Sequence, residues 1–261
     1  MRTPLKSAAT ATLLAMWAAA CSGCEALQNA LSNVESRTVT FEPVRTGARH
    51  AVDYSNFGIC HSRLESRVVG SRLWHLFTDR LGPTVSGISG HEVRIARGES
   101  CHLREVHRFQ SAVLFDLSSV PAGPVTLVEL RMRGLADYGT DPPIRVAPRG
   151  LCARHVVGRA TVEWPAGITG IEGWFHLISS APLSPPTFQL SSGRPFGPFI
   201  VTDTVNAWRN GTFANLGFTI EPDAGEVARY AGRIGELNEQ YMCGVMMGEY
   251  RLVVTVLVRR T

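Results

Sequence analysis

Glycine and proline interrupt this chain so often that long helices have little room. The 261 residues include 25 glycines and 15 prolines, with short apolar runs between them. The run Thr126–Arg133 alternates apolar and polar side chains, as a half-buried strand does, and Phe109–Phe115 is apolar enough to be buried on both faces. Many short strands separated by turns predict an all-β fold, an antiparallel β-sandwich of jelly-roll type. Further strands are expected at Ile144–Ala147, Arg159–Trp164, Trp174–Ile178, Thr187–Leu190, Pro198–Val201, Asn215–Glu221 and Tyr250–Arg259.

A single short helix is expected near residues 203–209. Asp203 belongs to the residue types that cap helix starts, and Asn210-Gly211 is a left-handed stop. Val205 and Trp208 lie three residues apart, which places both on one face of the helix. We therefore assign Asp203 to the helix cap and Trp208 to the hydrophobic core.

The first 24 residues have the pattern of a bacterial export signal. A cationic start is followed by an apolar run, Ala8–Ala20, and then by Cys21. The run is too short to span a hydrocarbon core of about 30 Å as a permanent helix. The small residues directly before Cys21 resemble a lipoprotein processing box, so residues 1–20 are expected to be removed and Cys21 to carry lipid. Ordinary signal cleavage and lipidation of Cys24 are the alternatives.

The exported chain carries nearly balanced charge. The formal net charge of +4 includes Arg2 and Lys6, and without them 24 basic residues face 22 acidic ones. That balance gives no electrostatic reason to expect nucleic acid or a membrane surface as a partner. Lys6 is the only lysine, so every cation after the signal is arginine. A GC-rich genome explains this bias, and recognition of carboxylate or phosphate by guanidinium groups is the alternative.

Beyond the signal, residues 21–37 are expected to form a tether and residues 38–261 the folded domain. Apolar residues at helical spacing in Glu25–Ser36 favour a short tether helix. A total of 44% hydrophobic residues is enough for one large β domain or two small ones.

Four cysteines lie beyond the signal region: Cys60, Cys101, Cys152 and Cys243. Outside the cytoplasm this even set can form two disulfides, although four cysteines permit three connectivities. We expect Cys60–Cys101 and Cys152–Cys243. The first pair brackets a poorly patterned stretch around 61–100, which we interpret as an insertion stapled at its base.

Several segments together carry a family resemblance. These are SAVLFDLSSVPAG at Ser111–Gly123, the strand Leu127–Met132, the pair Glu163-Trp164, the helix-containing segment Val201–Ile220 and the closing strand Leu252–Thr255. They resemble the DNRLRE-type domain, the disaggregatase-related β-sandwich of bacterial and archaeal surface proteins. The resemblance runs from about Thr38 to the C-terminus, although Arg63–Glu99 has no counterpart. It implies a non-catalytic module, with polysaccharide binding in some members, and it carries over no site residue.

Two small sets of residues are candidates for ligand binding. Aromatic rings stack on sugars, and Trp74 and Trp174 lie in irregular segments where exposure is expected. Asp137 and Asp141 belong to a loop that offers oxygen ligands of the kind calcium takes, although the same loop reads as an ordinary polar turn.

The histidines and carboxylates give little support to catalysis. His102 and His107 are five residues apart, so a continuous strand would place them on opposite faces. Zinc needs three or four convergent ligands, and we therefore assign these histidines to the surface or to packing. No nucleophile motif, glycine-rich phosphate loop or paired-carboxylate spacing is present.

These observations predict a non-catalytic, lipid-anchored protein of the cell envelope that binds extracellular or surface polysaccharide. The expected partners are the membrane, through acylated Cys21, and polysaccharide or another envelope protein. The expected location is the outer membrane or its periplasmic face, with the cell surface as the alternative. A structural protein that packs against another envelope protein is the second interpretation, and an uncharacterised polysaccharide-acting enzyme is the third. No cofactor is expected, with calcium as the alternative.

Overall fold

The computed structural model describes residues 33–57, 87–97, 102–137, 145–146, 154–163, 171–173, 179–183, 188–189, 195–231 and 240–260. The strands are β1 (Val34–Phe41), β2 (Pro43–Phe57), β3 (Gly87–Arg97), β4 (His102–Phe115), β5 (Val125–Asp137), β6 (Arg145–Val146), β7 (Arg154–Ala160), β8 (Ile171–Gly173), β9 (Ser180–Pro182), β10 (Phe188–Gln189), β11 (Pro195–Ile200), β12 (Phe218–Pro222) and β13 (Gln240–Arg259). The helices are α3 (Thr202–Arg209) and α4 (Ala224–Ala231).

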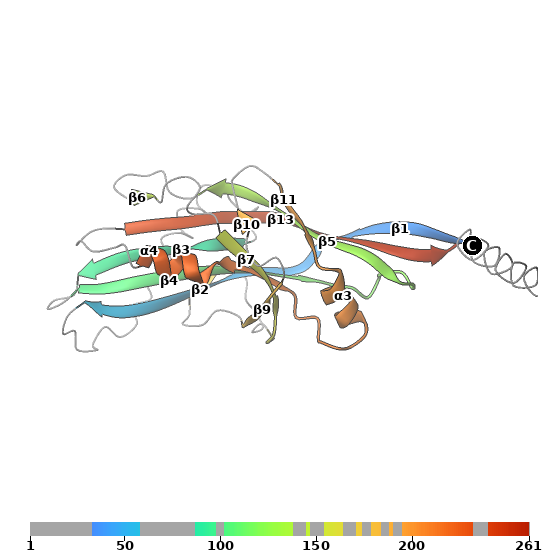
Figure 1. Ribbon diagram of the computed structural model, residues 1–261, viewed down its shortest axis with the longest axis horizontal. Helices are drawn as coiled ribbons and strands as arrows, with labels where there is room; N and C mark the ends of the chain where they lie inside the picture. Colours follow the sequence, from blue (N-terminus) through green and yellow to red (C-terminus); the bar gives the residue numbers. More distant parts are fainter. Residues whose placement is uncertain are drawn as a thin grey trace, which may run out of the picture.

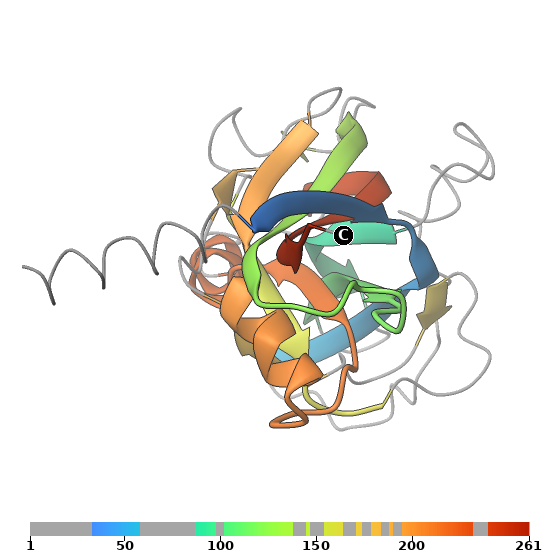
Figure 2. The same cartoon turned by 90° about the vertical axis from the view of Figure 1, so that its right-hand side faces the viewer.

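The strands form two facing layers, which confirms the predicted antiparallel β-sandwich (Figure 1, Figure 2). One layer has the order β1-β13-β5-β11, and the other has the order β2-β4-β12-β7. β3 pairs with both β4 and β13, so it joins the two layers at the end of the molecule opposite α3. Among the described strands, only the β2–β8 and β6–β13 pairs are parallel.

The hydrophobic core lies between the layers and extends toward α3. β5 alternates as predicted from Leu127 onward, with Arg131 exposed between the buried Leu130 and Met132. The core residues from alternate positions of β5 and β13 are at most 1% exposed: Val128, Leu130, Met132, Leu252, Val254 and Val256. Burying one such side chain contributes about 1.5–3 kcal/mol relative to leaving it in water.

β4 runs through the centre of the second layer and is buried on both faces, as its composition predicts. From Phe109 to Val113, every side chain is at most 1% exposed. The strand pairs with β2 along almost its whole length, from Pro43 opposite Phe115 to Phe57 opposite His102. This continuous pairing makes β4 a single strand, so His102 and His107 belong to opposite faces as expected.

α3 closes one end of the sandwich at the predicted position. Val205 is fully buried, and Trp208 is 7% exposed, with its ring centroid 4.8 Å from that of Phe218. The predicted stop is also present, because Gly211 has φ = +70°. The N–H groups of Gly211 and Thr212 donate to the carbonyl oxygens of Trp208 and Ala207, which is the Schellman pattern of a helix end.

The assignment of Asp203 to the helix cap is wrong. The cap position is Val201, no side chain caps the helix there, and Asp203 is an exposed residue of the first turn. Thr202 begins the helix instead, and its hydroxyl oxygen accepts a hydrogen bond from the N–H of Val128 at 2.9 Å. The start of α3 is therefore fixed by β5 rather than by a capping side chain, and Asp203 acts only on the helix dipole.

Two expected domain boundaries also need correction. The tether was expected to end at residue 37, but β1 already begins at Val34 and pairs with β13 from there. Val34 and Ser36 therefore belong to a strand rather than to a tether helix. The stretch around 61–100, expected to be an insertion, contains β3, which pairs on both sides, so residues 87–97 are part of the sandwich. β3 was missed because Gly87, Ser89 and Gly90 break its apolar pattern.

A second helix, α4, was not expected from the sequence. It follows Asp223, whose carbonyl oxygen accepts a hydrogen bond from the N–H of Val227 at 3.0 Å. The helix packs on β3 and β4. Val227 is 5% exposed and anchors the helix on the sheet. No helix within the described ranges is long and apolar enough to cross a membrane.

Candidate functional site

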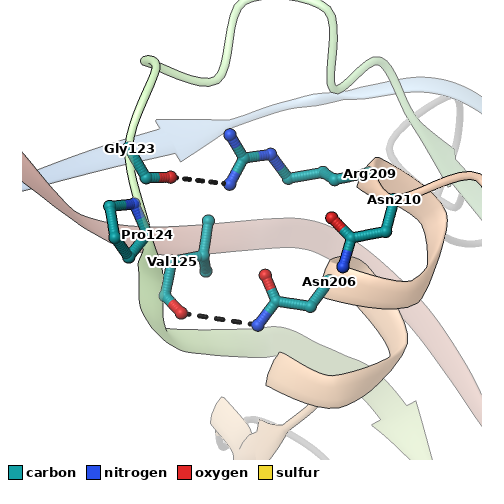
Figure 3. A pocket seen from close by; sticks show the side chains of 6 residues that line it. All are labelled: Gly123, Pro124, Val125, Asn206, Arg209 and Asn210. Atoms are coloured by element: carbon teal, nitrogen blue, oxygen red, sulfur yellow. Dashed lines mark hydrogen bonds between the residues drawn. The ribbon is translucent and has the colours of Figure 1, made fainter.

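A polar pocket of about 340 Å³ opens between α3 and the turn that joins β4 to β5 (Figure 3). Three residues of the turn side and three of the helix side line it: Gly123, Pro124, Val125, Asn206, Arg209 and Asn210. The helix side chains reach across toward the turn, so the pocket walls come from two separate elements. We call this the α3 pocket.

The turn side of the α3 pocket is held rigidly. At its start, the N–H and hydroxyl of Ser118 both donate to the carboxylate of Asp116 at 2.9 Å, and these bonds hold the pKa of Asp116 below its usual value. At its end, Gly123 has φ = +137°, and a Cβ there would collide with the carbonyl oxygen of Leu257. Glycine therefore allows the turn to lie directly on β13, where the N–H of Leu257 donates a hydrogen bond to the carbonyl oxygen of Pro124.

The helix side is tied to the same turn by two side chains. Arg209 donates from Nη1 to the carbonyl oxygen of Gly123 at 3.1 Å and from Nη2 to that of Pro121 at 3.4 Å. Asn206 donates from Nδ2 to the carbonyl oxygen of Val125 at 3.4 Å. These bonds preorganise the pocket because they fix both side chains before any ligand arrives.

The remaining polar groups of the α3 pocket suit hydroxyl-rich ligands. The amide of Asn206 keeps its oxygen as an acceptor, and the exposed amide of Asn210 offers both a donor and an acceptor. The lining contains no carboxylate, imidazole or thiol. The pocket can therefore hold a ligand by hydrogen bonds, but it offers no general acid, general base or nucleophile.

An exposed aromatic ring lies just beyond the helix. Phe213 follows Asn210 by three residues and is 43% exposed. The guanidinium carbon of Arg159 stacks 4.1 Å from its ring centroid, which orients the ring by a cation–π contact. An apolar ring held in this way is the kind of platform on which a sugar face can stack.

A second pocket, of about 320 Å³, lies at the corner between β1 and β2 and contains two carboxylates, Glu42 and Glu249. Each carboxylate forms an ion pair with an arginine: Glu42 with Arg251, and Glu249 with Arg133 at 3.4 Å. Neither carboxylate is in the apolar surroundings that keep a catalytic acid protonated at neutral pH.

Buried histidines lie at the β3 end of the molecule. His91 and His155 are each 1% exposed, and Nε2 of His155 lies 3.3 Å from the carbonyl oxygen of Ser89. Burial, reinforced by the neighbouring His155, lowers the pKa of His91 to about 3. His91 therefore stays neutral at the pH of most surroundings, which is the behaviour of a packing residue.

A half-buried group of polar side chains surrounds Glu221 of β12. Gln110 of β4 donates to one carboxylate oxygen at 3.0 Å, and Ser180 of β9 donates to the other at 2.8 Å. A Cβ on Gly158 would lie 3.0 Å from Cβ of Ser180, so glycine lets Ser180 approach. Both carboxylate oxygens are engaged within the fold, which indicates a structural role for Glu221.

Most of the site residues expected from the sequence lie outside the described residues. These are Cys21, Cys24, Cys60, Trp74, Cys101, Asp141, Cys152 and Trp174. Asp137 is described, but it is the last residue of β5, opposite Val245, rather than part of a loop. Within the described ranges, no three His, Cys, Asp or Glu residues are grouped so that they could hold a metal ion.

Cys243 lies in β13, opposite His91 of β3. Cys152, its expected partner, lies outside the described residues. The expected bridges Cys152–Cys243 and Cys60–Cys101 both stay predictions. Peptide mapping under non-reducing conditions tests both.

The helix-side residues of the α3 pocket lie in or next to the predicted helix, but the sequence does not mark them as a site. Asn210 was read as part of the stop, and Asn206 and Arg209 carried no pattern of their own. The turn residues that complete the pocket are 80 positions or more away, as the Arg209–Gly123 bond shows with its separation of 86. His155 was missed because the strand expected at Arg159–Trp164 lies at Arg154–Ala160 instead.

Comparison with known proteins does not place the chain in a family. No model of a known protein family matches it, and no curated protein matches it either.

Proposed function

We propose that this chain is a non-catalytic, lipid-anchored protein of the bacterial cell envelope that binds polysaccharide at the α3 pocket. The observation that carries the proposal is the lining of that pocket, which presents two amides and a guanidinium on ordered elements and no catalytic group. Sugar hydroxyls both donate and accept hydrogen bonds, so amide side chains match them in both roles.

The surroundings of the α3 pocket also favour an extended ligand. Phe213 offers an exposed ring three residues beyond Asn210, and the pocket is open rather than enclosed. A polymer can lay one sugar against the amides and a neighbouring sugar on the ring. The resemblance to DNRLRE-type domains favours the same class of ligand. The export signal and Cys21 favour a location in the cell envelope.

The experiment is a polysaccharide array probed with the complete chain from residue 21, bearing Cys21→Ser and Cys24→Ser so that it is soluble. We expect binding to at least one bacterial surface or extracellular polysaccharide. Asn210→Ala should weaken that binding about two- to tenfold, the usual worth of one or two hydrogen bonds. Thr212→Ala, also exposed but outside the pocket lining, is the matched control and should bind as the parent does.

Failure of the parent protein to bind any polysaccharide would remove the proposed activity. Binding that is unchanged in Asn210→Ala but lost in Trp74→Ala or Trp174→Ala would keep the activity and move its site. Release of new reducing ends from a bound polysaccharide would favour the enzyme interpretation instead.

One observation favours the structural alternative, docking against another envelope protein. Leu127 of β5 is 37% exposed and Ile200 of β11 is 55% exposed. Ile200 pairs with Glu129, two residues after Leu127, so both apolar side chains share the outward face of one layer. Cross-linking in intact cells that disappears in a Leu127→Glu, Ile200→Glu variant, with polysaccharide binding unchanged, would support this alternative.

A further inference from the structure

β1 pairs with β13 from Leu252 to Arg259, and beyond Val256, where the pairing of β13 with β5 ends, these two strands continue alone as a ribbon that extends past the body of the sandwich (Figure 1). Its register runs from Phe41 opposite Leu252 to Val34 opposite Arg259. The N–H of Arg260 donates to the carbonyl oxygen of Asn33 at 2.9 Å, so the two strands stay together to the tip. The tip is therefore an ordered structure at one extreme of the long axis.

Three arginines belong to this ribbon: Arg259 and Arg260 lie at its tip, and Arg37 lies further in on β1, opposite Val256. All three are exposed, and none forms an ion pair with another residue of the described ranges. Glu35 is the one acidic residue beside them, so the side chains of the ribbon carry an excess of two positive charges.

Three arginines on the body differ from those of the ribbon in this respect. Arg131, Arg133 and Arg251 each form an ion pair, with Glu129, Glu249 and Glu42 respectively. Their charge is neutralised locally, whereas that of the tip is not. The near-balanced charge of the whole chain therefore hides a local cationic site at the ribbon.

We propose that the ribbon tip binds the anionic phosphate headgroups of a lipid bilayer and holds the sandwich end-on to the membrane. The proposal rests on the lipid anchor of the proposed function. The described chain begins at Asn33, twelve residues after Cys21, and a fully extended segment of that length spans only about 40 Å. Because the described chain begins at the tip of the ribbon, the tip is the described part nearest to Cys21 in the sequence.

The chemistry of the tip fits a phosphate surface. Guanidinium groups bind phosphate oxygens through paired N–H donors, and basic residues are attracted to anionic lipid within a Debye length of about 8 Å at physiological salt. Attraction of this kind adds a contact with the headgroups to the proposed lipid anchor on Cys21 and orients the sandwich on the bilayer. The α3 pocket would then lie on the membrane-proximal half of the molecule, because α3 lies toward the ribbon (Figure 1).

The test uses the unacylated chain from residue 21, with Cys21→Ser and Cys24→Ser, in co-sedimentation with vesicles. One set contains 40% phosphatidylglycerol in phosphatidylcholine by design, and the other contains phosphatidylcholine alone. We expect binding to the anionic set only, weakening as sodium chloride rises. The tip variant Arg37→Gln, Arg259→Gln, Arg260→Gln should lose about tenfold or more of its partition coefficient.

The matched control is Arg131→Gln, Arg133→Gln, Arg251→Gln, which removes the same number of charges from the body. We expect it to bind anionic vesicles as the parent does, and thermal melts show that each variant is folded. The proposal is overturned if the parent fails to bind anionic vesicles, if it binds neutral ones equally, or if the control loses as much binding as the tip variant. Because the protein is unacylated, these results are independent of whether Cys21 carries lipid, which mass spectrometry of the cell-derived protein decides.

Discussion

The α3 end and the β3 end of this sandwich bury opposite kinds of side chain. At the α3 end, Trp208 and Val205 join an apolar core that continues along β5 and β13. At the β3 end, Ser89, His91 and His155 are each at most 1% exposed. An apolar core is stable whatever the pH, whereas buried imidazoles must stay neutral to remain there. The ends should therefore differ in how they respond to truncation and to acid.

The largest effect is expected at the α3 end. Trp208→Ala removes a ring that packs 4.8 Å from Phe218 and leaves a cavity, so the free energy of unfolding should fall by about 3–5 kcal/mol. Chemical denaturation of the two proteins at neutral pH measures the loss. Trp208→Phe, which keeps an aromatic ring, should lose less. A melt of Trp208→Ala that matches the parent would show that the ring is not part of the core and would make it a ligand-site candidate.

A smaller, pH-dependent effect is expected at the β3 end. Because the pKa of His91 is lowered to about 3, the unfolded chain takes up a proton below about pH 6.5 that the folded chain cannot accept. Stability is therefore full above pH 6.5 and falls toward pH 3, by about 1.4 kcal/mol for each pH unit from this group. His91→Gln should flatten that part of the stability curve, as measured by denaturation between pH 7 and pH 4. Identical slopes in the two proteins would contradict the neutral, buried state of His91.

The smallest effect is expected at Asp203, on the surface of α3. Because this carboxylate interacts with the helix dipole and caps nothing, Asp203→Asn should cost only about 0.3–1 kcal/mol and the cost should shrink in salt. Thermal melts at low and high ionic strength measure it. A loss of stability well above that range would indicate that the Asp203 side chain caps the helix after all.

The same two ends explain how far the sequence could predict the structure. The α3 end follows patterns that act over a few residues: the alternation in β5, the spacing of Val205 and Trp208, and the stop at Gly211. The β3 end does not, because a strand with Ser89, Gly90 and His91 in buried positions lacks the apolar periodicity that marks a strand. Its burial is imposed by the strands on either side: β4, which follows it in the chain, and β13, which is distant in sequence.

The candidate site was less predictable than the fold. The α3 pocket forms where a helix packs against a turn that lies far away in the chain. No local sequence pattern around Asn206 or Asn210 predicts that contact. The prediction that Asp203 caps α3 was wrong for a related reason. The hydroxyl of Thr202 accepts a hydrogen bond from the N–H of Val128 on a neighbouring strand, so a tertiary contact takes the place of the local capping bond expected from Asp203. The ribbon charge was hidden because Arg37 and Arg259 lie at opposite ends of the sequence.

The central claim is that ligand binding belongs to the α3 end and that the buried histidines serve the fold. The most direct measurement compares Asn210→Ala and His91→Gln for polysaccharide binding and for stability in parallel. We expect Asn210→Ala to lose affinity while its melt stays that of the parent, and His91→Gln to bind normally while its stability falls less than that of the parent between pH 7 and pH 4. Loss of binding in His91→Gln, with Asn210→Ala unaffected, would contradict the account.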